Sequence, residues 1–141
     1  MMQSVIRLAT ESDVYEINGI SQYLGFSALS DSDVLEKLSE LINSETDEVY
    51  VAEYSDKVVG WLHLFYTCRL ASDNFYEIGG LVVSLDFRGQ GIGKQLVQTA
   101  CSKHQEKIRV RCNDTRVESH KFYERLGFRG NKVQRVFDKH S

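Results

Sequence analysis

The stretch DFRGQGIGKQL, residues 86–96, places three glycines within five positions and then continues into a helical pattern. Leu96, Val97 and Ala100 recur at the spacing of one helical face, and a run rich in β-branched residues, 75–84, precedes the glycines. A strand, a glycine-rich turn and a helix start together predict an anion-binding site, because bare amides and the positive end of the helix dipole converge there.

Two common phosphate-binding loops do not fit this stretch. A Walker A loop needs a glycine five positions before Gly93, where Arg88 stands, and a Ser or Thr after Lys94, where Gln95 stands. A dinucleotide-binding fingerprint places its third glycine one position later than this chain does. The anion therefore has to be bound by another kind of loop, or the glycines form an ordinary tight turn.

Length and composition predict one domain over residues 1–141. The chain length suits a single core, and 42% of its residues are hydrophobic. No run of 18 apolar residues occurs, and residues 1–10 lack the pattern of a signal peptide, so we expect a cytoplasmic protein with no membrane partner. Cys68, Cys101 and Cys112 are odd in number and lack CxxC spacing, which predicts buried free thiols.

Charge is distributed unevenly along the chain. Residues 1–50 hold ten acidic and two basic side chains, whereas residues 107–141 hold four acidic and ten basic ones. The basic residues are spaced singly through an apolar pattern and the pI is near 5.8, so we expect a solvated face or an anionic cofactor and no nucleic-acid partner. The four histidines have no metal-ligand spacing, which predicts no metal site.

Hydrophobic periodicity predicts strands mixed with helices. Thr10, with Asp13 three residues later, is a typical helix start, and Gly79 and Gly80 mark a bulge or a close backbone approach. This order of elements predicts an α/β (α+β) fold with a mixed sheet. The expected strands are a short one from Val5, a hairpin of 49–54 and 58–66, then 75–84, 107–112 and 133–137; the expected helices begin near Thr10, Ser30 or Ser32, Gly93 and Val117.

The glycine stretch, Arg88-Gly-Gln-Gly-Ile-Gly, resembles the R/Q-x-x-G-x-G/A pyrophosphate loop of the GNAT superfamily of N-acetyltransferases. The segments 77–84, 107–113 and 119–128 resemble the other central motifs of that family, in the same order, and the resemblance covers residues 5–138. The end of the chain, from Arg109 onward, is similar to a bacterial subgroup of small single-domain members. The resemblance implies the GNAT fold: a mixed, mostly antiparallel central sheet that is splayed at the acetyl-CoA site and flanked by helices.

The resemblance also implies a set of cofactor contacts. The loop would wrap the pyrophosphate of acetyl-CoA, and the strand before it would pair with the pantetheine arm. Asn113 would contact the same arm, although an Asx-type turn is the alternative for this residue. The implied cofactor-binding residues are Leu81, Val82, Val83, Arg88, Gly89, Gln90, Gly91, Ile92, Gly93, Lys94, Asn113 and Tyr123.

Two side chains resemble catalytic groups of the family. A lysine-like amine, with a pKa of about 10.4, must lose a proton before it attacks a thioester. Glu77 aligns with the catalytic glutamate of the histone acetyltransferase branch if the turn 84–87 is two residues shorter here; a water chain or a solvent-facing glutamate is the alternative. Tyr123 corresponds to the family tyrosine that protonates the departing thiolate, and a packing role beside Phe122 is its alternative.

The implied activity is direct acetyl transfer from acetyl-CoA to a primary amine. The first helices of the family border the acceptor, so the acidic segment 1–50 is consistent with a small cationic acceptor, with Asp31, Asp33, Glu36 and Glu45 as candidate contributors. A solvated acidic face is the alternative for this segment. A protein or peptide amine and a non-catalytic acetyl-CoA sensor are the alternatives. A homodimer is a further expectation, because dimers are common in the family.

Overall fold

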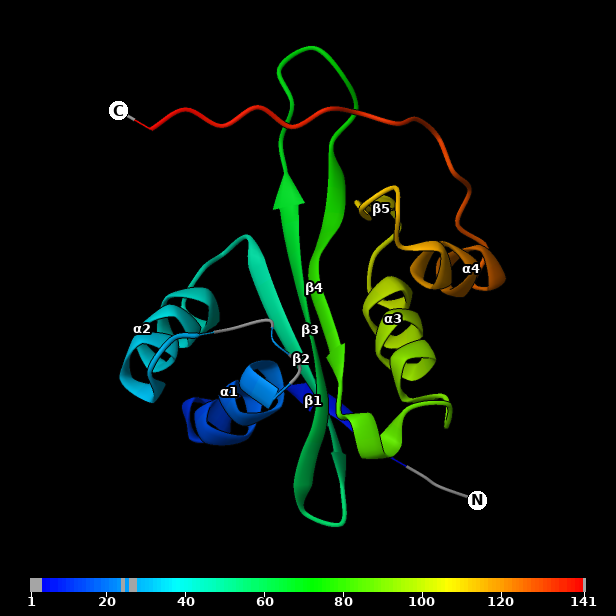
Figure 1. Cartoon of the computed structure of the whole chain (residues 1–141). Helices are drawn as coiled ribbons and strands as arrows, with labels where there is room; N and C mark the ends of the chain where they lie inside the picture. The colour runs from blue at the N-terminus through cyan, green and yellow to red at the C-terminus, as the bar shows by residue number, and fades with distance from the viewer. Residues whose placement is uncertain (1–3, 24, 26–27, 141) are drawn as a thin grey trace. The chain divides into compact units, whose positions relative to one another are not determined.

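The computed structural model describes residues 4–23, 25 and 28–140 (Figure 1). The chain divides into two compact units, Met1–Val110 and Arg111–Ser141. A single functional domain over the whole chain stays a proposal.

The first unit is built on one five-stranded sheet with the order β1-β2-β3-β4-β5. Strands β1 to β4 are antiparallel neighbours, and β5 runs parallel to β4. The mixed, mostly antiparallel sheet expected from the sequence is therefore confirmed. The strands are β1 (Val5–Leu8), β2 (Asp47–Tyr54), β3 (Lys57–Thr67), β4 (Phe75–Val83) and β5 (Lys107–Val110).

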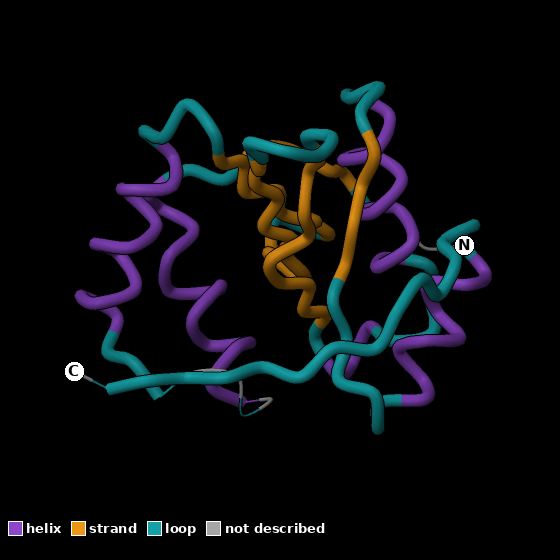
Figure 2. The backbone as a smooth tube through the Cα atoms, turned by 90° about the horizontal axis from the view of Figure 1, so that it is seen from above, coloured by secondary structure: helices purple, strands orange, loops and turns teal. Residues whose placement is uncertain are grey.

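Helices cover both faces of this sheet. Helices α1 (Val14–Tyr23) and α2 (Asp31–Ile42) lie on one face, and α3 (Ile92–Ser102) lies on the other (Figure 2). Val49 and Val51 of β2 pack in one cluster with Ile17 and Leu38 from the helices α1 and α2. Tyr50 alternates with these two valines and so points to the α3 side of the sheet. There the ammonium of Lys103, the residue after α3, lies 5.4 Å from the centre of the Tyr50 ring.

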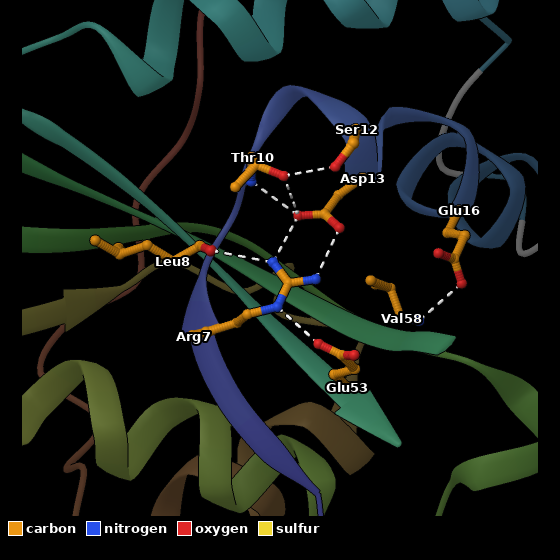
Figure 3. Close-up of polar contacts among 8 residues, drawn as sticks. All are labelled: Arg7, Leu8, Thr10, Ser12, Asp13, Glu16, Glu53 and Val58. Carbon is orange, nitrogen blue, oxygen red and sulfur yellow. Dashed lines mark hydrogen bonds and ion pairs between the residues drawn. The ribbon is translucent and has the colours of Figure 1, made fainter. Parts of the chain in front are cut away.

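A part-buried ion pair fixes the entry to α1. Arg7 of β1 donates to both carboxylate oxygens of Asp13, at 2.8 and 2.9 Å, and to Glu53 of β2 at 2.7 Å (Figure 3). Asp13 ends a short 3-10 helix, η1 (Glu11–Asp13), and also accepts from the backbone amide of Thr10 at 2.8 Å. Burial alone would raise the pKa of Asp13, but the hydrogen bonds from Arg7 and Thr10 lower it overall. The pair thus joins β1, β2 and the start of α1.

Most expected elements of the first unit are present. Ser30 caps α2, because its hydroxyl accepts from the amide of Asp33 at 3.2 Å. The β2–β3 hairpin turns through Ser55 and Asp56, which both have left-handed backbone (φ 50° and 64°). A second 3-10 helix, η2 (Leu85–Phe87), connects β4 to the glycine stretch.

The second unit contains helix α4 (Val117–Arg125), which ends before Gly127 with φ 95°. The expected closing strand over 133–137 is wrong: residues 129–140 form no strand, and Val133, Val136 and Phe137 are exposed. Alternating apolar residues form a strand only if a neighbouring strand is available for hydrogen bonding. The sequence pattern of one segment does not show whether such a neighbour exists.

The three cysteines are free, as expected, but none of them is buried. Cys68 is exposed, while Cys101 and Cys112 are half-buried. Cys68 lies just after β3, so the apolar residues before it in sequence do not surround it in space. None of the described helices has the length and apolar composition needed to cross a membrane.

Candidate active site

The glycine stretch forms an open turn between η2 and α3. Gly89 and Gly91 have φ values of 76° and 84°, a conformation that disfavours any side chain, and no atom lies within 4 Å of the position that a Cβ would take at either. Ile92, by contrast, is buried and anchors the first turn of α3. The turn therefore presents bare backbone to its surroundings while its far end is fixed in the core.

The N-terminus of α3 differs in charge from those of the other α-helices. Its N-cap is Gly91, which has no side chain to accept hydrogen bonds, and its first turn contains no acidic residue. The first turns of α1, α2 and α4 each contain at least one acidic side chain. The first amides of α3 are thus left for an external acceptor, and the helix dipole favours an anion there. Arg88 and Lys94 flank these amides, and both side chains are exposed.

Strand β4 separates from β5 partway along its length. The two strands pair only from Phe75↔Lys107 to Ile78↔Val110, whereas β4 continues to pair with β3 as far as Val83. Within the described residues, 79–83 have no strand on the β5 side, so this backbone edge can hydrogen-bond to an extended ligand. Leu81, Val82 and Val83 lie in this segment, which leads directly to η2 and the glycine turn.

The separation begins at a bulge in β4. Ile78 pairs with Leu64 and Gly80 pairs with His63, so Gly79 is an extra residue opposite β3. A Cβ on Gly79 would lie 2.9 Å from His63 Nδ1, and one on Gly80 would lie 2.8 Å from the Trp61 ring. Trp61 is itself fixed, because its Nε1 donates to the hydroxyl of Ser21 in α1 at 3.0 Å. The bulge expected from the two glycines is confirmed, and rings of β3 occupy the space that side chains would fill.

Glu77 lies just before this bulge. It is opposite Phe65 of β3 and Arg109 of β5, and its side chain is half-buried. Directly opposed residues of antiparallel strands share a face, so Glu77 is on the face of Phe65 and His63, which is the side covered by α1 and α2. The carboxylate is thus close along the strand to the point where β4 leaves β5.

The second unit holds the two other predicted site residues. Asn113 forms an Asx-type turn, in which its Oδ1 accepts from the Thr115 amide at 3.0 Å and from the Thr115 hydroxyl at 2.8 Å. His120 Nε2 lies 3.0 Å from the carbonyl oxygen of Asn113. The turn that was the alternative for Asn113 is therefore present, and it leaves the side-chain NH₂ group as the donor.

Tyr123 lies in α4 between two aromatic neighbours. Its ring meets Phe122 and Phe128 edge-on, with ring centres 5.0 and 5.5 Å apart. Burial and the nearby Cys112 raise the pKa of Tyr123 to about 12, against a smaller opposite effect of Arg116. The phenol is thus protonated at neutral pH and can act as a hydrogen-bond donor, while its packing role is also present.

The pair of His63 and Asp47 was not predictable from the sequence. His63 Nε2 lies 2.7 Å from Asp47 Oδ1, on the face of the sheet that carries Glu77. The two residues are 16 positions apart, and only the register of β2 against β3 brings them together, so neither spacing nor periodicity reveals the pair. Among the described residues, no three His, Cys, Asp or Glu side chains are grouped so as to hold a metal ion.

Solved structures with the same architecture are numerous. The aminoglycoside N-acetyltransferase AAC(6′)-Iy in complex with CoA matches with a TM-score of 0.84 and 17% identity, over 100% of this chain and 97% of that chain. An aminoglycoside acetyltransferase from an uncultured soil metagenomic sample, in complex with trehalose, has a TM-score of 0.81 and 21% identity, over 98% of this chain and 97% of that chain. A Trypanosoma brucei acetyltransferase has a TM-score of 0.78 and 24% identity, over 97% of this chain and 100% of that chain. At these identities the likeness shows the fold.

A search of curated proteins found no significant match. A sequence profile described as the acetyltransferase (GNAT) family matches residues 12–128, which include the open glycine turn, the separated part of β4 and α4. The chain therefore belongs to the GNAT family of acetyltransferases, enzymes that take their acetyl group from acetyl-CoA.

Proposed function

We propose that this protein transfers an acetyl group from acetyl-CoA directly to a primary amine of a small cationic acceptor. The observation that carries the proposal is the continuity of β4 with the glycine turn. One backbone runs from Glu77 through the segment 79–83, which pairs with β3 but has no described strand on its β5 side, to the open amides at the start of α3. That arrangement suits a ligand with an acyl thioester at one end, an extended amide-rich arm and a pyrophosphate at the other end.

The proposed cofactor contacts follow this order. Residues 88–94 bind the pyrophosphate through their amides, with Arg88 and Lys94 adding positive charge. Leu81, Val82 and Val83 pair with the pantetheine arm through backbone, as a partial substitute for a neighbouring strand. The NH₂ group of Asn113 donates to the same arm.

Two side chains of this chain serve the chemistry in the proposal. Glu77 attracts the ammonium form of the acceptor and takes its proton, directly or through water. Tyr123 donates to the thiolate as it leaves, and its raised pKa of about 12 keeps this donor protonated. No covalent intermediate with the protein is needed, because the amine itself attacks the thioester carbonyl.

The acceptor class rests on charge. Residues 1–50 include α1 and α2 and carry a net charge of −8, from ten acidic and two basic residues. Such a field favours a cationic acceptor over a neutral one. Several of the similar structures are aminoglycoside acetyltransferases, which agrees with this acceptor class. A protein amine remains the second candidate, since a lysine side chain is also cationic.

The assembly and compartment belong to the same proposal. We place the protein in the cytoplasm because Cys68, Cys101 and Cys112 are free thiols, which suits a reducing compartment. The chain acts as one acetyltransferase domain and forms a homodimer in this proposal, which gel filtration with light scattering tests directly.

The test is acetyl-CoA-dependent thiol release over a panel of polyamines, aminoglycosides, amino acids and lysine peptides, with a control that lacks acceptor. The protein thiols react with the same reagent, so only release far beyond the protein concentration counts. We expect turnover on a cationic class, with a KM that rises with ionic strength because salt screens the acidic segment. Binding of acetyl-CoA without turnover on any amine would contradict the proposal and favour a sensor.

A further inference from the structure

His63 and Asp47 form an oriented pair beside the bulge of β4. Asp47 Oδ1 lies 2.7 Å from His63 Nε2, while Oδ2 accepts from the hydroxyls of Ser44 at 2.7 Å and Thr46 at 3.0 Å. The side chains are 23% exposed for His63 and 18% exposed for Asp47. A carboxylate held on both oxygens can fix the orientation and tautomer of the imidazole that it faces.

The charge of Asp47 decides which ring nitrogen of His63 is free. Burial alone would raise the pKa of the Asp47 carboxyl, but hydrogen bonds from His63, Ser44 and Thr46 lower it overall. The carboxylate is therefore ionised at neutral pH and can only accept, so Nε2 carries the proton of the pair. In the neutral imidazole, Nδ1 is then the nitrogen with a lone pair to offer.

Nδ1 of His63 lies at the point where β4 leaves β5. It is 2.9 Å from the position that a Cβ would take on Gly79, the bulge residue. Glu77 is on the same face, two residues earlier in β4. A thioester held along residues 79–83 would have its acyl end near this bulge, so an amine that approaches from the side of α1 and α2 meets both His63 and Glu77.

We propose that His63, oriented by Asp47, accepts the proton of the acceptor amine, while Glu77 attracts the ammonium group through its charge. This inference rests on the proposed acetyl transfer and refines the role of Glu77 within it. The ammonium gives one proton to Nδ1, and the neutral nitrogen attacks the thioester carbonyl carbon. The C–N bond forms, the C–S electron pair leaves on sulfur, and the second N–H proton ends on the thiolate. The imidazolium then returns its proton to solvent.

The chemistry of the two residue types favours histidine for this step. A free imidazole titrates about two pH units closer to neutrality than a free glutamate carboxylate, so it is the stronger proton acceptor in general. A general base works best when it titrates near the operating pH. A carboxylate that stays charged is better suited to hold the cation before it reacts.

The charged groups on this face of the sheet are given by strand register. Asp47 of β2 and Glu77 of β4 are the ionisable neighbours of His63, and Arg109 of β5 lies opposite Glu77. Farther along, Arg7 and Glu53 are paired with each other. The residues that α1 and α2 bury are uncharged: Val14, Ile17, Asn18, Ser21 and Leu38. The acid–base behaviour proposed for His63 therefore depends chiefly on Asp47 and Glu77.

The experiment compares variants on the best amine of the panel between pH 7 and pH 10. His63→Gln should lower kcat/KM by about 100-fold at pH 7, and the loss should shrink to about 3-fold or less at pH 10, where solvent has deprotonated much of the amine. Asp47→Asn should give about a 10-fold loss with the same pH trend. Glu77→Gln should raise KM at pH 7 and change kcat little, because its charge attracts the ammonium form. Imidazole in the buffer should restore part of the activity of His63→Ala.

The matched control is the second histidine–carboxylate pair of the chain. His104 Nε2 lies 2.8 Å from Glu48 Oε1, and Glu48 alternates with Val49 so that this pair is on the α3 side of the sheet. His104→Gln should leave kcat/KM unchanged at all pH values. Circular dichroism and thermal melting verify folding, and Asp47→Asn carries the test if His63→Gln does not fold.

The outcomes separate this inference from the proposed function. A loss in His63→Gln that is equal at all pH values, or no loss, would overturn the role of His63 while wild-type turnover keeps the acetyltransferase standing. A loss of kcat that shrinks with rising pH in Glu77→Gln, with no such loss in His63→Gln, would assign the proton to Glu77. Absence of wild-type turnover on every amine would remove the proposed function itself.

Discussion

At the scale of single residues, Tyr123 gives the sharpest prediction. Tyr123→Phe should lower kcat by about 10- to 100-fold and leave acetyl-CoA affinity unchanged, because it removes a proton donor and keeps the ring packed against Phe122 and Phe128. Steady-state kinetics and calorimetry with acetyl-CoA measure the two effects. Since the pKa of Tyr123 is raised to about 12, deprotonation of this residue should cause no fall in rate below about pH 11.

The control for Tyr123 is Phe122→Leu, which disturbs the same aromatic contact without touching the hydroxyl. It should lower stability more than it lowers kcat. A Tyr123→Phe enzyme with wild-type kcat would limit Tyr123 to packing.

Single residues were predictable from sequence where local chemistry decides their role. Gly79 and Gly80 indicated a bulge because two adjacent glycines have few other uses in a strand, and the structure has the bulge there. The pair of His63 and Asp47 could not be predicted, because a contact between strands depends on their register.

At the scale of elements, the glycine turn gives a second prediction. Gly91→Ala should weaken acetyl-CoA binding by about 10-fold or more, because a Cβ stands where the pyrophosphate would approach and the φ of 84° becomes strained by about 1–2 kcal/mol. Calorimetry with acetyl-CoA measures the affinity, and urea unfolding measures the strain.

Gly25→Ala is the matched control for this strain. Gly25 also has a positive φ, 78°, and no atom within 4 Å of its Cβ position, but it lies between α1 and α2. The variant should lose similar stability and keep wild-type acetyl-CoA affinity. Equal affinity in Gly91→Ala and the wild type would place the pyrophosphate elsewhere.

Elements were predictable to the extent that one segment determines its own structure. The helix after the glycine stretch and the β2–β3 hairpin have strong local signals, namely an apolar helical face and a short polar turn. The strand expected at 133–137 failed because a strand also needs a neighbour, which its own residues do not specify.

At the scale of the whole molecule, the ion pair of Arg7 and Asp13 predicts how stability depends on pH. Asp13→Asn should lower the free energy of unfolding by about 2–4 kcal/mol at pH 7, because it leaves Arg7 without its buried partner. The folded-state pKa of Asp13 is below its ordinary value, so this stabilisation is present above about pH 4 and is lost as the pH falls through the lowered pKa. Urea unfolding at pH 7, 5 and 3 measures the convergence of variant and wild type.

Glu53→Gln is the control for this pair, since Glu53 binds the same guanidinium with a more exposed side chain. It should cost less than about 1 kcal/mol. A pH-independent difference between Asp13→Asn and the wild type would mean that packing, rather than charge, sets the cost.

The glycine bulge of β4 also limits how this enzyme can evolve. A side chain at position 79 would collide with the ring of His63, and one at position 80 with the ring of Trp61. Both rings are held by hydrogen bonds, so substitutions of these two glycines should not be tolerated. A population selected for growth on a new amine should therefore accumulate substitutions at Phe65 of β3, or in α1 and α2. Deep mutational scanning under such selection should find Phe65 permissive for new specificity, and the two glycines and His63 invariant.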